Sequence, residues 1–293
     1  MPHRLTLSIL LWSVLISSLV AQTPVSIVAT DAKTRTPLPY ALLTFGSAPG
    51  GAYADEAGRI TAASPLTATE AIVSAVGYRT DTVALSSLPD TIRLRPVAYQ
   101  TEVVTVAARR GKVETVRYGK SSLPFPATYG YSSLPGSLVV RYLGGDWERN
   151  GQLETVTFRM DIEGRECVGK VRVRVFSARQ VGQSGGPDED VLRENVIVEV
   201  LPNRNKYTVD LSPYGINYPP EGLCVGIEFL GANPECNQDK TFRGRVMVLG
   251  STREEPARSW LRFNFRGEAR WRRYSSIVEG KALNPRFGAT VRY

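Results

Sequence analysis

Residues 170–176 read Lys-Val-Arg-Val-Arg-Val-Phe, in which charged and apolar side chains alternate from Lys170 to Val175. Successive side chains of a β-strand point to opposite faces, so the three valines would face a core while Arg172 and Arg174 face the other side. The run Thr91-Ile-Arg-Leu-Arg95 alternates in the same way. Beyond the first 22 residues, no long stretch has the 3.6-residue period of an amphipathic helix. The pattern predicts an all-β protein.

Other runs with strand character are separated by Gly, Pro, Asn and Asp, which favour turns. In the first third of the chain the clearest are Val25–Thr30, Ala41–Phe45, Ala71–Ala75 and Thr91–Arg95. In the second half they are Ser137–Tyr142, Thr155–Ile162, Lys170–Phe176, Asn195–Leu201, Tyr207–Leu211, Leu223–Leu230, Val246–Leu249, Trp260–Arg266, Ala269–Tyr274 and Phe287–Tyr293. This spacing predicts a small β-sandwich followed by a larger, jelly-roll-like β-sandwich.

The length of 293 residues fits about two domains. We expect the first sandwich over residues 23–107 and the second over 137–293. The segment 108–136 between them is polar, rich in Pro, Gly, Ser and Tyr, and longer than a usual loop. We therefore interpret 108–136 as a linker.

Residues 1–22 have the pattern of a signal peptide. His3 and Arg4 form a short basic start, Leu5–Val20 is largely apolar, and Ala21 offers a small residue at a cleavage site. A transmembrane anchor is the alternative, but the apolar core is shorter than the roughly 20 residues that span a bilayer. The prediction is export to the periplasm, the outer-membrane surface or the medium, with no transmembrane helix.

The only histidine is His3, inside this leader. A Ser-His-Asp or Cys-His nucleophile, an HExxH metal helix and a His-ligated zinc site all need an imidazole that the mature chain would lack. We therefore expect no catalytic residues, no metal site and no cofactor.

Four segments of the first domain, TPLPYALLTF (36–45), ADEAGRI (54–60), VGYRTDTVAL (76–85) and IRLRPV (92–97), carry a family resemblance. They resemble the carboxypeptidase-regulatory-like module, which begins many exported proteins of the Bacteroidetes type. The resemblance covers about residues 24–98. It implies a transthyretin-like sandwich that is accessory and carries no catalytic residues. From the residues themselves, we expect Asp55 to cap a turn, Gly58 and Gly77 to form turns, and Tyr78 to close one end of the core.

The following segment, Gln100–Ala107, is similar to the stretch after this module in TonB-dependent outer-membrane receptors. Those receptors need a barrel of about 22 strands, for which too few residues remain. The plain interpretation is a last strand of the first domain or the start of the linker.

Three cysteines, Cys167, Cys224 and Cys236, would enter a compartment that permits disulfides. Three pairings are open, each leaving one thiol over, and the sequence does not choose between them. Cys224 lies in an apolar run, which fits a small buried residue equally well.

The positive charge is concentrated at one end. Residues 241–293 contain twelve Lys and Arg and four Glu, which accounts for the whole net charge of +8. An exported basic surface would meet an anionic glycan, a lipid head group or an acidic envelope protein rather than nucleic acid. The alternative is a solvated face without a specific partner.

The sharpest candidate site is the segment 260–274. Apolar residues alternate with Arg262, Asn264 and Arg266, and a tight turn around Gly267 would bring the next strand alongside. Such a hairpin would display guanidinium groups and an indole on one outer face, while Trp271 would point to the core. These groups suit anionic or sugar ligands through paired hydrogen bonds and stacking. The candidate ligand-binding residues are Trp260, Arg262, Arg266, Arg270 and Arg272.

Two weaker patterns involve acidic residues. Gly185–Val191 places three acids beside a Gly-Pro turn, as in calcium loops, but lacks their alternating spacing and fits a solvated turn better. Asp161, Glu163 and Glu166 could include a glycosidase pair, although nothing fixes their separation.

The sequence thus predicts a non-enzymatic, exported protein with an envelope- or surface-binding or structural role. One alternative is a carboxylate-based polysaccharide hydrolase, in which two acids of the second domain would converge in a pocket. The other is a small outer-membrane β-barrel, because Phe287, Ala289, Val291 and Tyr293 alternate up to a terminal aromatic residue.

Overall fold

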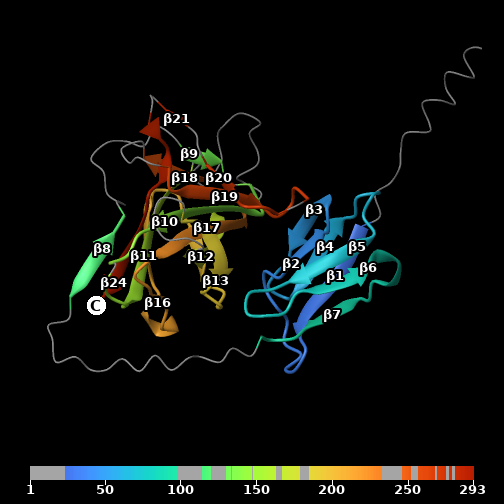
Figure 1. Cartoon of the computed structure of the whole chain (residues 1–293). Helices are drawn as coiled ribbons and strands as arrows, with labels where there is room; N and C mark the ends of the chain where they lie inside the picture. Colours follow the sequence, from blue (N-terminus) through green and yellow to red (C-terminus); the bar gives the residue numbers. More distant parts are fainter. Residues whose placement is uncertain are drawn as a thin grey trace, which may run out of the picture.

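The computed structural model describes residues 24–97, 114–119, 130–132, 134–146, 148–162, 167–178, 185–232, 246–251, 257–267, 269–274, 277–278 and 281–293. Within these ranges the chain forms β-strands and two single turns of 3-10 helix, so the all-β prediction is confirmed. Two sandwiches lie side by side (Figure 1). The described residues include no helix that is long and apolar enough to cross a membrane. The predicted leader, residues 1–22, and the segment Glu102–Ala107 lie outside the described ranges.

The first sandwich is built from two small sheets. Its strands are β1 (Pro24–Asp31), β2 (Leu42–Phe45), β3 (Ala48–Tyr53), β4 (Arg59–Ala63), β5 (Glu70–Ser74), β6 (Asp81–Ala84) and β7 (Thr91–Leu94). One sheet has the order β4-β1-β7 and the other β3-β2-β5-β6. Their facing side chains form a core that includes Ile27, Leu43, Phe45, Ile60, Val73, Ile92 and Leu94. The alternation predicted for residues 91–95 is confirmed, since Ile92 and Leu94 are buried and their arginine neighbours exposed.

The turns of this domain also follow their sequence. The Asp55 carboxylate accepts hydrogen bonds from the backbone N–H groups of Ala57 and Arg59, and Gly58 has a φ of 74°. Gly77 has a φ of 82°, and the Tyr78 ring packs against the core while its hydroxyl donates to Asp31. These predictions are confirmed. Those for Asp55, Gly58 and Gly77 depend on residues only a few positions away in the chain.

The second domain holds the remaining strands, of which β21 and β22 form a separate two-stranded sheet. They are β8 (Thr115–Tyr118), β9 (Gly130–Ser132), β10 (Ser137–Leu143), β11 (Gly151–Ile162), β12 (Gly169–Ala178), β13 (Pro187–Asp190), β14 (Ile197–Val200), β15 (Lys206–Asp210), β16 (Asn217–Tyr218), β17 (Leu223–Ala232), β18 (Val246–Ser251), β19 (Ser259–Phe263), β20 (Arg272–Arg273), β21 (Ile277–Val278), β22 (Lys281–Ala282), β23 (Asn284–Pro285) and β24 (Phe287–Arg292).

Two sheets of this domain enclose its main core. The first, here called the β12 sheet, has the order β13-β12-β17-β10-β19-β20, with β14 also paired to β12. The second, the β11 sheet, has the order β23-β18-β11-β24-β8, with further pairing by β9, β15 and β16. The three valines of residues 170–176 are fully buried between the sheets, as predicted. From the β11 sheet they meet Leu153, Val156, Phe158, Phe287 and Val291.

The predicted linker, 108–136, is wrong in part. Within it, β8 pairs with β24 and β9 pairs with β18, so both strands extend the β11 sheet. The Tyr118 ring stacks on the Tyr218 ring at a centroid distance of 5.2 Å. The alternation Thr-Val-Arg-Tyr at 115–118 spans only four residues within a polar segment. So short an alternation is too weak to predict a strand.

The described cysteines differ in their chemical state. Cys167 is disulfide-bonded, whereas Cys224 is a free thiol on a fully buried side chain, and Cys236 lies outside the described residues. Burial raises the pKa of the Cys224 thiol far above its ordinary value. The interpretation of Cys224 as a small buried residue is therefore confirmed.

We expect Cys224 to be unreactive in the folded protein, because burial excludes the reagent and disfavours the thiolate. Iodoacetamide followed by mass spectrometry should find Cys224 unmodified in native buffer and modified in urea. Equal labelling rates in the two conditions would contradict this packing.

Candidate binding site between the two domains

The outer face of the β12 sheet carries a row of charges that the strand register creates. Arg172 of β12 lies opposite Glu228 of β17, Glu228 opposite Leu138 of β10, and Leu138 opposite Arg262 of β19. Because paired residues share a face, the arginines that alternate with the buried valines meet Glu228 on the same side. Around Glu228 this face is shielded from solvent, because Tyr40 and Tyr53 of the neighbouring first sandwich contact it (Figure 1).

Glu228 is the centre of this row, and its carboxylate is saturated with hydrogen bonds. Its Oε1 accepts from the Tyr53 hydroxyl at 2.6 Å and from Asn264 Nδ2 at 2.9 Å. Its Oε2 accepts from Arg172 at 3.1 Å and from Arg174 at 2.5 Å. Only 1% of the Glu228 side chain is exposed. Four donors on two oxygens offset the cost of burying a carboxylate.

The same contacts set the ionisation of Glu228. Burial alone would raise the pKa of its carboxyl, but the charges of Arg174 and Arg172 and the Tyr53 hydrogen bond outweigh burial and lower it to about 2. Glu228 is therefore a fixed negative charge at neutral pH.

Arg174 connects Glu228 to a second carboxylate. Its other terminal nitrogen pairs with Asp190 at the end of β13. Burial is the main cause that raises the pKa of Asp190, opposed by the Arg174 charge. Position 226, opposite Arg174 on β17, is a glycine, where a Cβ would lie 2.1 Å from the Val139 carbonyl oxygen. Arg174 therefore reaches Glu228 diagonally, from the position opposite Gly226.

The first domain contributes directly to this cluster. Besides the Tyr53 hydroxyl, the backbone carbonyl of Tyr40 accepts a hydrogen bond from Arg172 at 2.6 Å. Lys170 Nζ lies 3.2 Å from the Tyr40 hydroxyl and 3.3 Å from Glu56. The two sandwiches thus share a polar network that is buried at its centre.

The tip of the β19–β20 hairpin makes a second contact between the two domains. Phe265 packs between two glycines, since a Cβ on Gly51 or on Gly136 would lie 2.6 Å from its ring. Its carbonyl accepts a hydrogen bond from Gly50 N–H at 3.0 Å, and its ring lies 5.3 Å from that of Tyr53. In Figure 1 the hairpin extends toward β3, where this contact is made.

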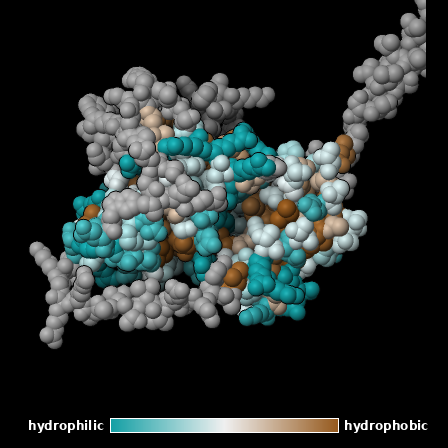
Figure 2. All heavy atoms as spheres, viewed as in Figure 1, coloured by the Kyte–Doolittle hydropathy of each residue, from teal (hydrophilic) through white to brown (hydrophobic). Residues whose placement is uncertain are grey.

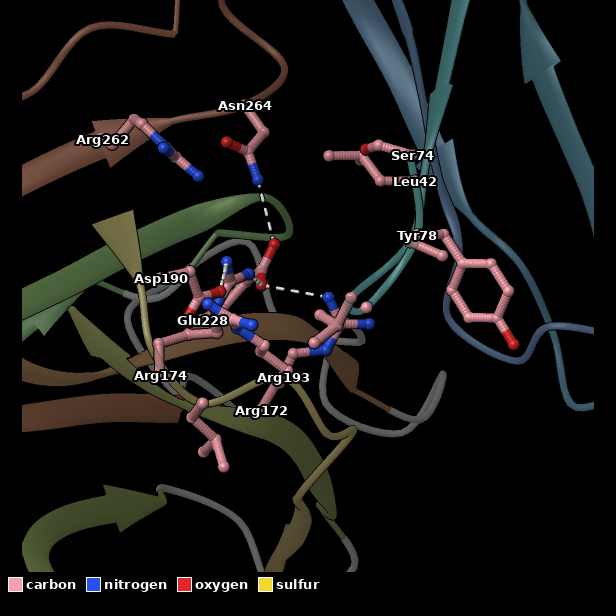
Figure 3. A pocket seen from close by; sticks show the side chains of 14 residues that line it. Leu42, Ser74, Tyr78, Arg172, Arg174, Asp190, Arg193, Glu228, Arg262 and Asn264 are labelled. Atoms are coloured by element: carbon pink, nitrogen blue, oxygen red, sulfur yellow. Dashed lines mark hydrogen bonds and ion pairs between the residues drawn. The ribbon is translucent and has the colours of Figure 1, made fainter. Parts of the chain in front are cut away.

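A pocket of about 210 Å³ lies between the two domains, beside the Glu228 network. The first domain lines it with residues from β2, the end of β5 and the β5–β6 loop, none of them charged, among them Leu42, Ser74 and Val76. The second domain lines it with the charged row and with Leu192 and Arg193. Figure 3 shows the two walls facing each other, with the Tyr78 hydroxyl turned away from the charged side chains. Hydrophobic residues, brown in Figure 2, also gather where the first sandwich meets the second.

Arg262 differs from the other arginines of the row. Among the described residues it has no hydrogen-bond or ion-pair partner, and its Nε is buried. Its guanidinium lies 4.8 Å from the centre of the Trp271 ring. Burial chiefly, and the neighbouring Arg174 charge, lower the pKa of Arg262. A guanidinium in this position is an incompletely satisfied cation on the pocket wall.

The predicted hairpin is present, but its faces are not arranged as predicted. Trp260 pairs with Arg273 and Leu261 with Arg272, so Arg262 shares a face with Trp271. The observed register is shifted by one residue from that of a turn centred on Gly267, and this shift reverses which residues of the second strand meet Trp260.

The five candidate ligand-binding residues therefore lie in three different environments. Trp260 is buried beside Phe176 and Cys224, which corrects its placement on an open surface. Arg262 lines the pocket, while the others are exposed, namely Arg266, Arg270 and Arg272. Trp271, expected in the core, lies with Arg262 and packs edge-on against Phe176 at 5.2 Å.

The acidic candidates are also dispersed. Asp188 and Glu189 are exposed, and only Asp190 of that segment reaches the pocket. Asp161 is exposed, and Glu163 and Glu166 lie outside the described residues. Within the described part of the chain, no group of three or more His, Cys, Asp or Glu gathers as metal ligands would.

Two carboxylates converge in the pocket, Asp190 from the candidate segment 185–191 and Glu228, which was not among the sequence candidates. The available signal was Glu228 itself, a lone acid in the otherwise apolar run 223–230, since an isolated charge in a buried strand needs a partner.

The chain matches no protein-family model, and comparisons with curated proteins and with solved structures found no match either. The chemistry of the pocket is therefore the ground for a functional conclusion.

Proposed function

We propose that this chain is a non-enzymatic, exported binding protein of the cell envelope, and that it holds the anionic group of its ligand in the pocket between the two sandwiches. The observation that supports the proposal is Arg262, a guanidinium on the pocket wall without a hydrogen-bond or ion-pair partner among the described residues. An anion there would supply the charge-assisted hydrogen bonds that the fold leaves open.

The exposed arginines of the same hairpin support an anionic partner as well. Arg266, Arg270 and Arg272 are exposed on the hairpin that carries Arg262. Their positive potential would attract an anionic glycan, a lipid head group or an acidic envelope protein toward the pocket.

A polysaccharide hydrolase is the second candidate, because Asp190 and Glu228 share the pocket and their pKa values shift in opposite directions. Against it, both carboxylates already bind Arg174, and Glu228 has no oxygen left for a substrate. Release of reducing ends from an envelope polysaccharide that is lost in Asp190→Asn would favour the hydrolase over the binding protein.

Replacing Arg262 with glutamine should strongly weaken anion binding. Charge-assisted hydrogen bonds contribute about 1.5–3 kcal/mol each, so we expect at least a tenfold loss of affinity. The measurement is the thermal shift given by sodium phosphate and sodium acetate, each against sodium chloride of equal ionic strength. Arg266→Gln is the matched control, since it removes an equal charge from the exposed part of the hairpin. Equal shifts in both variants, or no shift in the unmodified protein, would refute the proposal.

A further inference from the structure

We infer that Trp271 is a positioning residue of this pocket, whose ring holds the Arg262 guanidinium at the pocket wall and leaves its terminal N–H groups open to the ligand anion. This inference rests on the proposed function and adds a residue to its site. It follows from how each arginine of the charged row is held, from the place of Trp271 in the fold and from the packing of its ring.

The arginines of the charged row are held in two different ways. Arg172 and Arg174 are held by a carboxylate, since both pair with Glu228. These contacts take up terminal N–H groups of both side chains. Arg262 is held by a ring instead, because its guanidinium carbon lies 4.8 Å from the centre of Trp271. An aromatic ring attracts a cation through its quadrupole and needs no oxygen acceptor, so the terminal N–H groups of Arg262 keep their capacity for a ligand.

Trp271 acts from behind the pocket wall. It immediately precedes β20, and within the described part of the chain the pocket lining includes Arg262 but not Trp271. In Figure 3 the Arg262 side chain extends from β19 toward the other lining side chains. The Trp271 ring therefore supports Arg262 and does not itself touch the ligand.

The Trp271 ring is in turn fixed by packing. It meets Phe176 edge-on, at a centroid distance of 5.2 Å and an interplanar angle of 83°. This contact joins it to the small apolar cluster that also contains Trp260. On its other side, Phe176 lies 5.2 Å from the guanidinium of Arg174. A ring held in place limits the rotamers of the arginine that lies over it, so less conformational entropy is lost when Arg262 binds an anion.

Isothermal titration of the full chain with sodium phosphate and with sodium acetate tests this role. We expect Trp271→Leu to weaken anion binding by about three- to tenfold, because Arg262 loses its ring contact and regains rotational freedom. Trp271→Phe, which restores a ring face, should bind within about twofold of the unmodified protein. The matched control is Trp260→Leu, since Trp260 lies in the same hairpin with its ring 6.0 Å from the guanidinium of Arg273, outside the lining of the pocket. This control should leave the affinity unchanged within about twofold.

Tryptophan fluorescence gives a second measurement that does not depend on a loss of stability. An anion bound at Arg262 changes the electric field at the neighbouring Trp271 ring, so the emission should change with the same midpoint as the calorimetric titration. The change should disappear in Trp271→Phe, which still binds the anion, and persist in Trp260→Phe. Constant emission of the unmodified protein at saturating anion, or changes of equal size in the two phenylalanine variants, would overturn the positioning role.

The outcomes keep the two proposals distinct. Anion binding that is weakened in Arg262→Gln but unchanged in Trp271→Leu would overturn the positioning role and leave the proposed function standing. Equal losses in Trp271→Leu and Trp271→Phe, or in Trp271→Leu and Trp260→Leu, would likewise overturn it, because they would indicate a general loss of packing. Absence of binding by both anions in the unmodified protein would overturn the proposed function itself.

Discussion

Replacing Glu228 with alanine is expected to lower the free energy of unfolding by about 3–5 kcal/mol, because it leaves Arg172 and Arg174 buried without their shared carboxylate. Their side chains are 3% and 11% exposed, so water cannot take the place of the lost oxygen atoms. Urea unfolding followed by tryptophan fluorescence measures the difference.

Glu199→Ala is the control for this experiment. Glu199 lies on β14, beside β12 in the same sheet, but it is exposed, so its removal should change stability by less than about 0.5 kcal/mol. Similar losses in the two variants would show that the arginines around Glu228 do not depend on it.

The lowered pKa of Glu228 makes the stability of the protein depend on pH in acid. Its folded pKa of about 2 lies below its ordinary value of 4.5, so its contribution is complete above about pH 4.5 and is lost as the pH falls toward 2. The unmodified protein should therefore lose its advantage over Glu228→Ala across this interval.

Gly51→Ala should destabilise the protein more than Gly231→Ala does, by about 2 kcal/mol. The two glycines have φ angles of 149° and 152°, so alanine brings similar backbone strain to both. At Gly51 a Cβ would also lie 2.3 Å from the Leu43 carbonyl oxygen and 2.6 Å from the Phe265 ring. At Gly231 it would meet no atom within 4 Å.

The greater loss of stability in Gly51→Ala comes from overpacking, which typically costs 1–3 kcal/mol. The added methyl group would displace Phe265 from the domain boundary. The same urea titration compares both variants. Equal losses would mean that Phe265 does not pack against Gly51 as described.

Local patterns in the sequence predict much of the fold. The valines at 171, 173 and 175 are buried as their alternation indicates, and Gly58 and Gly77 form turns with positive φ. These features depend on neighbouring residues, so a short window of sequence contains them.

The candidate site depends on partners far apart in the chain and was predicted only through Arg262. The alternation at 170–176 places Arg172 and Arg174 on one face, but it does not reveal that a second domain covers this face. The hairpin at 260–274 was identified, yet parity arguments fail when the register shifts by one residue, since every side chain of the second strand then changes face.

The two sandwiches are joined at Glu228 and enclose the pocket there. A double-mutant cycle between Tyr53→Phe and Glu228→Ala measures this junction, because the hydrogen bond between these residues, 2.6 Å long, crosses the domain boundary. We expect a coupling energy of about 1.5–3 kcal/mol in urea unfolding. Effects that add within about 0.5 kcal/mol would contradict the docked arrangement and the pocket with it.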